Sequence, residues 1–457
     1  MNASNGANNM NKEDKLERMT TAPIPSLIFS LAVPSMISML ITSFYNTADT
    51  YFVGKINTEA TAAVGINFAV MSILQALGFF FGHGSRHYIS RQLGAQNNQE
   101  ASTMASTGFF LAFLSGCVVA VIGCLFSTQL AIFMGSTPTI LPYAKSYMSI
   151  ILLGAPVMMC ALVMNNQLRF QGSAAYGMVG IVSGGMLNVV LDPLFIFVFN
   201  MGIAGAAWAT ILSQAISLGI LLYMSHKGGN LQIHWSKFKP SMARVREIFA
   251  GGLPSLFRQG FGSLGTIVLN VAAGAYGDAA IAGMSIVTRL SFFAGAASVG
   301  FGQGYQPVCG FNYGAGIYRR VREGFRFCLL VMTGFSLFIS VVGYIYADSI
   351  IQVFRDDPAV IEIGTMALKA QTFTFFLTGL VVIANMTLQT TRHTKGAIIM
   401  AAARRGLYLI PALFVLPRFW GVTGLIWCQP VSDICAFLTA FVLSKLFFRH
   451  LPKESNL

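Results

Sequence analysis

Long apolar segments with few charges run through the whole chain, and they restrict its fold more than any other feature. A helix that crosses a lipid bilayer needs about 20 mostly apolar residues. Twelve segments reach this length, at residues 25–50, 61–84, 102–125, 142–168, 174–199, 203–224, 245–270, 279–304, 322–346, 360–388, 395–417 and 421–446. Because backbone polar groups in lipid must be satisfied within their own segment, we predict an all-α integral membrane protein with twelve transmembrane helices.

The composition agrees with a membrane protein and excludes several other classes. Charged residues make up only 10% of the chain, against about 25% in soluble domains. A net charge of +13 would favour a nucleic-acid partner in a soluble protein, but here the basic residues gather between the apolar segments. The sequence has no P-loop, no Cys/His metal cluster and no HExxH motif, so we expect no enzyme activity, cofactor, resident metal or nucleic-acid partner.

Lysine and arginine lie mainly on one side of the predicted membrane. The side of the N-terminal tail carries Arg86, Arg91, Arg169, Lys227, Lys237, Lys239, Arg244, Arg246, Arg319, Arg320, Arg322, Arg326, Arg392, Lys395, Arg404, Arg405, Lys445, Arg449 and Lys453. The opposite side carries only Lys55, Lys145, Arg355, Lys369 and Arg418. Since cytoplasmic loops hold the excess of basic residues, both termini are expected in the cytoplasm.

The two halves of the chain repeat each other at an offset of 220 residues. The matched pairs are Ile28-Phe29 with Ile248-Phe249, Pro34-Ser35 with Pro254-Ser255, Phe81-Gly82-x-Gly84 with Phe301-Gly302-x-Gly304, Gly94-Ala95 with Gly314-Ala315, Pro138 with Pro358, and Asn165 and Leu168 with Asn385 and Leu388. Near the ends of the halves, Gly202-x-x-Gly205-x-x-Trp208 matches Gly421-x-x-Gly424-x-x-Trp427 at 219. Because the offset changes by only one residue across all these matches, we infer that the two halves of the chain are a duplication.

The duplication predicts two pseudo-symmetric lobes of six helices each. We expect a cytoplasmic tail at 1–22, an N-terminal lobe at 23–224, a basic linker at 225–243, a C-terminal lobe at 244–446 and a second cytoplasmic tail at 447–457. An even number of spans per copy makes the copies parallel repeats related by an axis along the membrane normal. A central cavity is expected at their interface, and one chain is sufficient to form it, so we expect a monomer.

Asn188 and Asp192 are polar residues in an otherwise apolar span. Their spacing of four places both side chains on one face of a helix. A carboxylate at this depth costs about 3 kcal/mol and is retained when it has partners, faces a cavity or spends time protonated. Pro193 follows and weakens the helix at this point. The alternatives are that Asn188 only links helices and that Asp192 only caps a broken one.

Tyr45 and Asp49 form a second pair with the same spacing in the first span. The two acids together predict a site that responds to protons or cations inside a membrane transporter. Thr210 in the sixth span is expected to join the network through its hydroxyl group. Alternatively, Asp49 lies at the membrane surface, Tyr45 belongs to an interfacial aromatic belt, and Thr210 only packs.

Taken together, these features resemble the multidrug and toxic compound extrusion family, in its MepA-like branch. The resemblance rests on Pro34-Ser35, Tyr45-x-x-x-Asp49, Asn188-x-x-x-Asp192-Pro193, the Gly-x-x-Gly-x-x-Trp segments and the duplication, and it covers nearly the whole chain after the tail. It implies two six-helix lobes around a V-shaped cavity and the exchange of cytosolic, mostly cationic amphiphilic drugs for external H⁺ or Na⁺. It also implies that Tyr45, Asp49, Asn188, Asp192 and Thr210 couple transport to the ion, with Asp49 and Asp192 as the Na⁺ ligands if Na⁺ is used.

The C-terminal half departs from the family pattern. Some relatives carry acids there for a second cation site, but the seventh span here has none and Glu362 is near the end of its span. Instead, Arg258 and Arg289 lie within spans, with Asp433 further along. Since unpaired arginines are costly in lipid, we expect a structural ion pair with Asp433. The alternative is that the arginines contact substrate in the cavity, together with the polar candidates Gln75, Asn67, Gln167 and Gln303.

The predicted function is therefore drug-like small-molecule efflux by alternating access, in exchange for H⁺ or Na⁺, across a bacterial plasma membrane. A flippase for a lipid-linked saccharide or peptidoglycan precursor is the alternative, because Arg258 and Arg289 would suit an anionic substrate. The polar first 20 residues lack the apolar stretch of a signal peptide, so no cleaved signal is expected.

Overall fold

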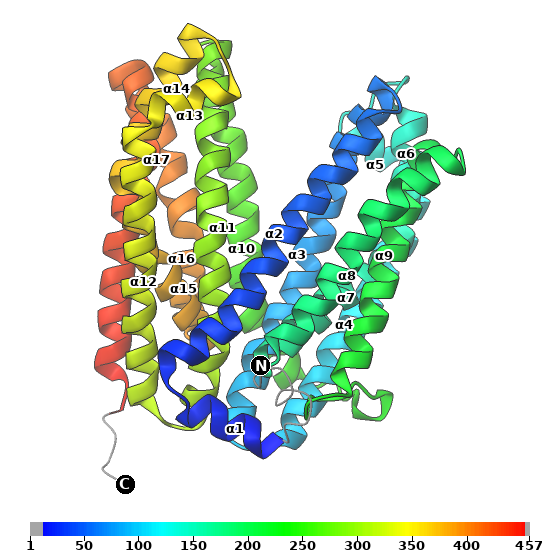
Figure 1. The fold of residues 1–457 in the computed structure, drawn as a ribbon, viewed down its shortest axis with the longest axis vertical. Coiled ribbons are helices and arrows are strands. Elements are labelled where there is room, and N and C mark those ends of the chain that lie inside the picture. The colour runs from blue at the N-terminus through cyan, green and yellow to red at the C-terminus, as the bar shows by residue number, and fades with distance from the viewer. Residues whose placement is uncertain (1–11, 453–457) are drawn as a thin grey trace, which may run out of the picture. The chain divides into compact units, whose positions relative to one another are not determined.

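The computed structural model describes residues 12–452, apart from the side chains at positions 43, 46, 47 and 50. Within this range the chain is helical and contains no strand (Figure 1). Contacts divide the described residues into two units. Unit 1 contains those up to Ala22 and Val33–Gly252, and unit 2 contains Pro23–Ala32 and those from Leu253 onward. The ends of the predicted tails, 1–11 and 453–457 with Lys453, lie outside the described residues.

Unit 1 consists of the first helices of the chain, most of which are long and apolar. In order they are α1 (Lys12–Thr21), α2 (Ile24–Gly54), α3 (Thr58–Gly94), α4 (Asn98–Leu125), α5 (Ser127–Phe133), α6 (Leu141–Leu153), α7 (Ala155–Phe170), α8 (Ala174–Pro193), the π-helix η2 (Leu194–Val198), α9 (Gly202–Ser225) and the 3₁₀ helix η3 (Trp235–Lys237). Helices α6 and α7 meet at 52° and form one bent pair. Pro156, in the first turn of α7, has no N–H to extend α6 and starts the new helix there.

Unit 2 repeats this order. Its helices are α10 (Met242–Gly274), α11 (Asp278–Gly314), α12 (Tyr318–Ile345), α13 (Ala347–Phe354), α14 (Pro358–Phe375), α15 (Thr378–Thr390), α16 (Thr394–Ala402), the π-helix η4 (Ala403–Leu407) and α17 (Leu409–His450). Helices α14 and α15 form a bent pair at 54°, as α6 and α7 do. The backbone of α17 is non-helical at Gly421, with φ 56° and ψ −134°.

Each predicted transmembrane segment lies on its own part of this helical structure. Eight described helices are long and apolar enough to cross a membrane, or ten if each bent pair is one span. The run Thr394–His450 is counted once among these, but it contains two predicted segments, 395–417 and 421–446, which meet at the break at Gly421. Helix α10 covers the predicted segment 245–270.

The cores of the two units use equivalent positions. Each unit has a large cluster of buried apolar side chains, and many members of one cluster match members of the other at the offsets found in the sequence. Such matched core pairs include Val53 and Ala273, Ala60 and Ala280, Ala131 and Ile351, Ala206 and Leu425, and Ala207 and Ile426. The duplication read from the sequence therefore extends to the packing.

The repeated Phe-Gly-x-Gly motif permits close helix contact at the second glycine of each copy. In unit 1, a Cβ atom on Gly84 would lie 2.3 Å from the Ile248 carbonyl oxygen in α10. In unit 2, a Cβ on Gly304 would lie 2.5 Å from the backbone nitrogen of Ala32 in α2. Only glycine fits against backbone at these distances. As a result the first part of α10 packs in unit 1 and the first part of α2 packs in unit 2.

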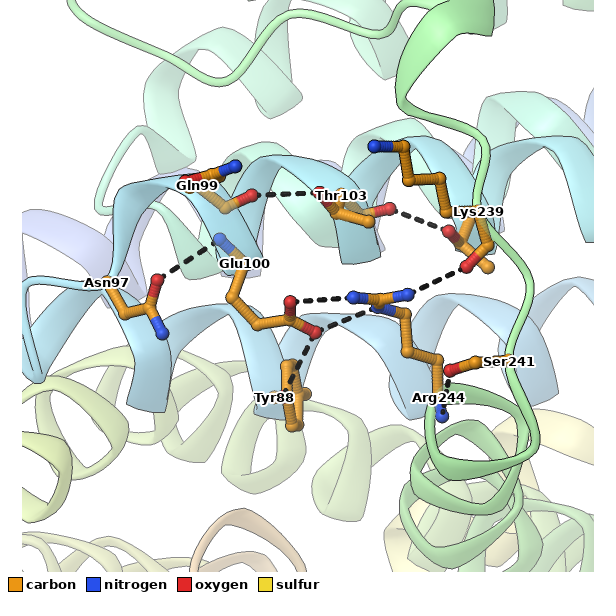
Figure 2. A network of polar contacts seen from close by, with 9 residues as sticks. Tyr88, Asn97, Gln99, Glu100, Thr103, Lys239, Ser241 and Arg244 are labelled. Atoms are coloured by element: carbon orange, nitrogen blue, oxygen red, sulfur yellow. Dashed lines mark hydrogen bonds and ion pairs between the residues drawn. The ribbon is translucent and has the colours of Figure 1, made fainter.

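Two ion pairs fasten the start of α10 within unit 1. Arg244 donates from Nε and Nη2 to the two carboxylate oxygens of Glu100, each at 2.8 Å, and Tyr88 donates to the same carboxylate (Figure 2). A few residues further along α10, Glu247 forms an ion pair with Arg91 of α3 at 3.0 Å. A bidentate arginine–carboxylate pair constrains geometry as well as supplying energy, so this segment is held to α3 and α4.

Helix α1 packs against the loop regions of unit 1. Its Lys15 side chain is 7% exposed and donates to the Asn230 side-chain oxygen, which also accepts from Ser173. Met19 is buried and contacts the positive-φ residue Gly172. Burial, with added repulsion from Arg18 and Lys12, lowers the pKa of Lys15 to about 7. Its amine therefore changes charge near neutral pH.

Candidate functional site

Two carboxylic acids lie next to each other inside unit 1. Asp49 of α2 and Asp192 of α8 are within hydrogen-bonding reach of each other, and Asp192 has no exposed surface. The Asn188 side-chain amide donates to Asp192 Oδ1 at 3.1 Å. Asp49 Oδ1 and Asp192 Oδ2 are buried and have no hydrogen-bond partner among the described side chains and backbone. The pair therefore has two acceptor oxygens available for a proton or a cation.

Hydroxyl and amide groups surround the acid pair. Tyr45 lies near Asp49 and within hydrogen-bonding reach of Gln214. Tyr147 lies near both acids, within reach of the Thr210 hydroxyl, and is fully buried. The structure thus brings together all five residues predicted to form the coupling site: Tyr45, Asp49, Asn188, Asp192 and Thr210.

Sequence reasoning missed Tyr147 and Gln214. Gln214 lies four residues after Thr210 on α9, so helical spacing could have identified it. Tyr147 lies in an apolar segment of α6, and nothing in its neighbourhood distinguishes it from a core aromatic residue. Its position near both acids follows only from the packing of α6 within unit 1.

Local helix geometry places the acids. Asn188 and Asp192 stack on one face of α8, which ends at Pro193 and continues as the π-helix η2. Single π-turns occur often at functional sites because they shift side chains out of regular register. Gly185, one turn before Asn188, leaves room for Tyr45: a Cβ there would lie 2.8 Å from its ring.

The adjacent acids can take up a proton or a cation. The described residues contain no group of three or more His, Cys, Asp or Glu side chains that could hold a metal. Two adjacent carboxylates repel each other when both are ionised, and a proton between them or Na⁺ on the free oxygens relieves this repulsion. The neighbouring hydroxyl and amide oxygens add neutral donors for such an ion.

Two of the predicted cavity residues connect helices. The Asn67 amide donates to the Ala63 and Ala144 carbonyl oxygens at 2.9 and 3.1 Å. The Gln167 amide donates to Ser85 and to the Ala105 carbonyl, both at 3.1 Å. Both side chains have no exposed surface, and these bonds link α3 to α6 and α7 to α3 and α4. A role in binding substrate stays a prediction for both.

The other four cavity candidates have different surroundings. Gln75 on α3 is half-buried and Gln303 on α11 is buried. Arg258 on α10 is half-buried and Arg289 on α11 is exposed. Within residues 12–452 the structure gives neither arginine a hydrogen bond or an ion pair, and their contact with substrate also stays a prediction.

The predicted ion pair between Asp433 and Arg258 or Arg289 is wrong. Asp433 Oδ1 accepts from Arg404 Nε at 2.7 Å. Further donors to the Asp433 carboxylate are Gln371 at 2.8 Å, Gln429 at 2.9 Å and Thr374 at 3.4 Å. Arg404, which was expected on the side of the N-terminal tail, lies in η4, ten residues into the helical run that starts at Thr394.

Comparison with sequence families gives two matches to one profile. The MatE family profile matches residues 34–194 and again residues 254–414. The separation of the two matches is the 220-residue offset of the internal repeat. The matched regions together cover more than half of the chain.

The chain is similar over its whole length to curated bacterial proteins. A multidrug export protein MepA from Staphylococcus haemolyticus (strain JCSC1435) is 29% identical over 449 residues, which cover 98% of this chain and 99% of the relative. A protein of the same description from Staphylococcus aureus (strain NCTC 8325 / PS 47) is 27% identical over 449 residues, covering 97% and 99%.

Solved structures share the fold over the same length. A MATE structure in a bent conformation has a TM-score of 0.90 at 23% identity and covers 97% of this chain and 98% of its own. An outward-facing multidrug resistance MATE transporter of the MOP superfamily has a TM-score of 0.86 at 24% identity, covering 94% and 99%. A MOP superfamily transporter from Pyrococcus furiosus, described as having a binding pocket of reversed polarity, has a TM-score of 0.88 at 23% identity, covering 96% and 98%. The all-α, two-lobe membrane fold predicted from the sequence is thereby confirmed.

Proposed function

Because the chain belongs to the MatE family of membrane transporters, we propose that it is a secondary antiporter that exports amphiphilic, cationic small molecules in exchange for H⁺ or Na⁺. Full-length similarity to MepA multidrug export proteins supports drug-like substrates. The acid pair of Asp49 and Asp192 in unit 1 is the observation that carries the coupling, since it offers two unpartnered carboxylate oxygens in a buried position.

Ion uptake at the acid pair drives the cycle. When the site is open to the outside, H⁺ or Na⁺ neutralises the charge that Asp49 and Asp192 share, which removes their mutual repulsion. The change is transmitted to the Asn188–Asp192 hydrogen bond and to α8, where Pro193 and η2 leave the backbone less constrained. Unit 1 is then biased toward the conformation that releases substrate. The ion needs only a higher affinity for one of the two conformations to shift this balance.

The protein works as a monomer in a bacterial plasma membrane, with lipids as its surroundings and both termini in the cytoplasm. The bacterial origin of the curated relatives supports this location. The excess of Lys and Arg on the side of the N-terminal tail supports the orientation.

Proteoliposomes test the proposal directly. The full-length protein is reconstituted, and export of a cationic dye is measured with an imposed pH gradient and, separately, with an imposed Na⁺ gradient. We expect one gradient to drive dye movement in the wild type and Asp192→Asn to abolish that coupling. Undiminished exchange in Asp192→Asn would remove the acid pair from the mechanism.

A surface acid provides the matched control. The Asp348 side chain is 68% exposed and pairs with Lys369 in unit 2. The Asp348→Asn variant should therefore transport dye as the wild type does. A flippase for lipid-linked saccharides, the alternative function, would leave the dye unmoved under either gradient and would instead transfer a lipid-linked substrate between leaflets.

A further inference from the structure

Unit 2 contains a small, partly open cavity of about 20 Å³ with both apolar and polar walls. It is lined by α10, α11, α14, η4 and α17 of that unit. Its polar wall is formed by Thr288, Ser291, Gln371, Gln429, Arg404 and Arg405. A water molecule needs roughly 10–15 Å³ measured in this way, so the cavity holds one or two water molecules or one small chemical group.

The cavity has two arginines and one neighbouring acid, Asp433, so it carries an excess of one positive charge. Asp433 is committed to Arg404, with Gln371, Gln429 and Thr374 completing its hydrogen bonds. Arg405 adjoins this pair, but in the part of the chain that the structure describes its guanidinium has no hydrogen bond or ion pair. An arginine at membrane depth is costly unless it finds a partner, so Arg405 offers an unfilled binding position for an anion.

Neutral donors line the same space. The hydroxyl groups of Thr288 and Ser291 on α11 face the cavity and have no hydrogen-bond partner among residues 12–452. Each of the Gln371 and Gln429 amides gives one N–H to Asp433 and keeps a second. A guanidinium with hydroxyl and amide donors is a set that binds carboxylates and small inorganic anions.

The location of Arg405 supports a functional role. Arg404 and Arg405 lie in the π-helix η4. The altered helical register there allows two consecutive arginines to line the same cavity. Only Arg404 is needed to neutralise Asp433.

We propose that this cavity binds a small monoanionic group through Arg405, either the carboxylate of a transported compound or a free anion such as chloride. With a substrate carboxylate, this deepens and rests on the proposed export function: Arg405 selects exported amphiphiles that carry a carboxylate over otherwise identical ones that do not. Binding of a free anion does not depend on transport.

A pair of substrates that differ by one charge tests the first source. Export of a zwitterionic amphiphile with a carboxylate is compared with export of its methyl ester in proteoliposomes. We expect Arg405→Gln to reduce zwitterion export about 10- to 100-fold, the range for losing a charged hydrogen bond, and to leave ester export within about twofold. Arg405→Lys should recover part of the loss, and Arg418→Gln, which removes an exposed arginine outside the predicted binding residues, should change neither substrate.

Anion-dependent melting of the detergent-purified, full-length protein tests the second source. A rise in melting temperature with chloride or acetate that Arg405→Gln removes, without any difference between zwitterion and ester, would identify a free anion as the occupant. The proposal is overturned if Arg405→Gln, or Arg405→Met should the first variant not fold, changes neither the substrate preference nor the anion response. If the wild type exports neither compound, the export function fails, while the melting measurement still decides the cavity.

Discussion

The two units have the same architecture but different polar residues at their centres. At the offset of 220, Tyr45 corresponds to Gly265 and Gly185 to Arg405. Tyr45 contacts Gly185 in unit 1, and Gly265 contacts Arg405 in unit 2. In unit 1 a large ring lies against a glycine, and in unit 2 a glycine lies against the arginine backbone.

The acids of unit 1 have apolar counterparts in unit 2. Asp49 corresponds to Leu269 and Asp192 to Ala412, whereas the cavity of unit 2 holds Arg404, Arg405 and Asp433. The duplication thus preserved the backbone and the core, and the polar residues diverged. This difference is consistent with the ion coupling proposed for unit 1, and it gives unit 2 a net positive centre.

The largest expected effect is the loss of the buried ion pair in unit 2. Asp433 is 1% exposed, and Asp433→Ala leaves both Arg404 and Arg405 without a counter-charge. Removing one partner of a buried pair costs about 3–5 kcal/mol, which should appear as a large fall in the melting temperature of the purified protein. Asp348→Ala at an exposed ion pair should change stability by less than about 1 kcal/mol. Equal melting of Asp433→Ala and wild type would show that this acid is not structural.

Substitution of the acids of unit 1 should have the opposite effect on stability. Asp49→Asn and Asp192→Asn each remove one of two repelling charges, so stability should stay the same or rise, while coupled dye export falls at least about tenfold. Because the two acids act as one unit, the double variant should be no worse than either single variant. Additive losses of export across this double-mutant cycle would contradict a shared ion.

Two glycine substitutions compare the packing at the two centres. A Cβ at position 265 would lie 2.6 Å from the Arg405 carbonyl oxygen, and one at position 185 would lie 2.8 Å from the Tyr45 ring. Backbone cannot move as a side chain can, so Gly265→Ala should cost about 1–3 kcal/mol and Gly185→Ala less. Melting temperatures measure the costs, and Gly185→Ala should also weaken export by displacing Tyr45. The reverse order of destabilisation would mean that the Tyr45 ring is the more rigid contact.

The smallest expected effect concerns the first helix of unit 1. Helix α1 buries Lys15, whose pKa falls from 10.5 to about 7. The undocked helix binds more protons between these two pH values, so docking should strengthen as pH rises from 7 toward 10.5 and be weakest below 7. Hydrogen exchange of α1 at pH 6 and pH 8.5 measures this, and Lys15→Met should remove the pH dependence. Identical protection at both pH values in the wild type would show that Lys15 stays in one charge state.

Sequence information was sufficient for the features that depend on local chemistry. Apolar length alone located the membrane helices, because a bilayer requires about 20 apolar residues whatever their neighbours are. The 220-residue offset predicted two similar halves, and both the core pairs and the glycine contacts follow it. The spacing of Asn188 and Asp192 also predicted that they share one helix face, since four residues are about one helical turn, and the structure joins them there by a hydrogen bond.

Only the tertiary structure decided which distant groups meet. Arg404 and Asp433 are 29 residues apart, and their pairing depends on how η4 shifts the register before α17 begins. Tyr147 reaches the acid pair through the packing of α6, and Arg405 reaches a cavity formed by five elements. Such contacts depend on helix bends, π-turns and crossing points, which arise from the packing of all the helices together and leave no local pattern in the sequence.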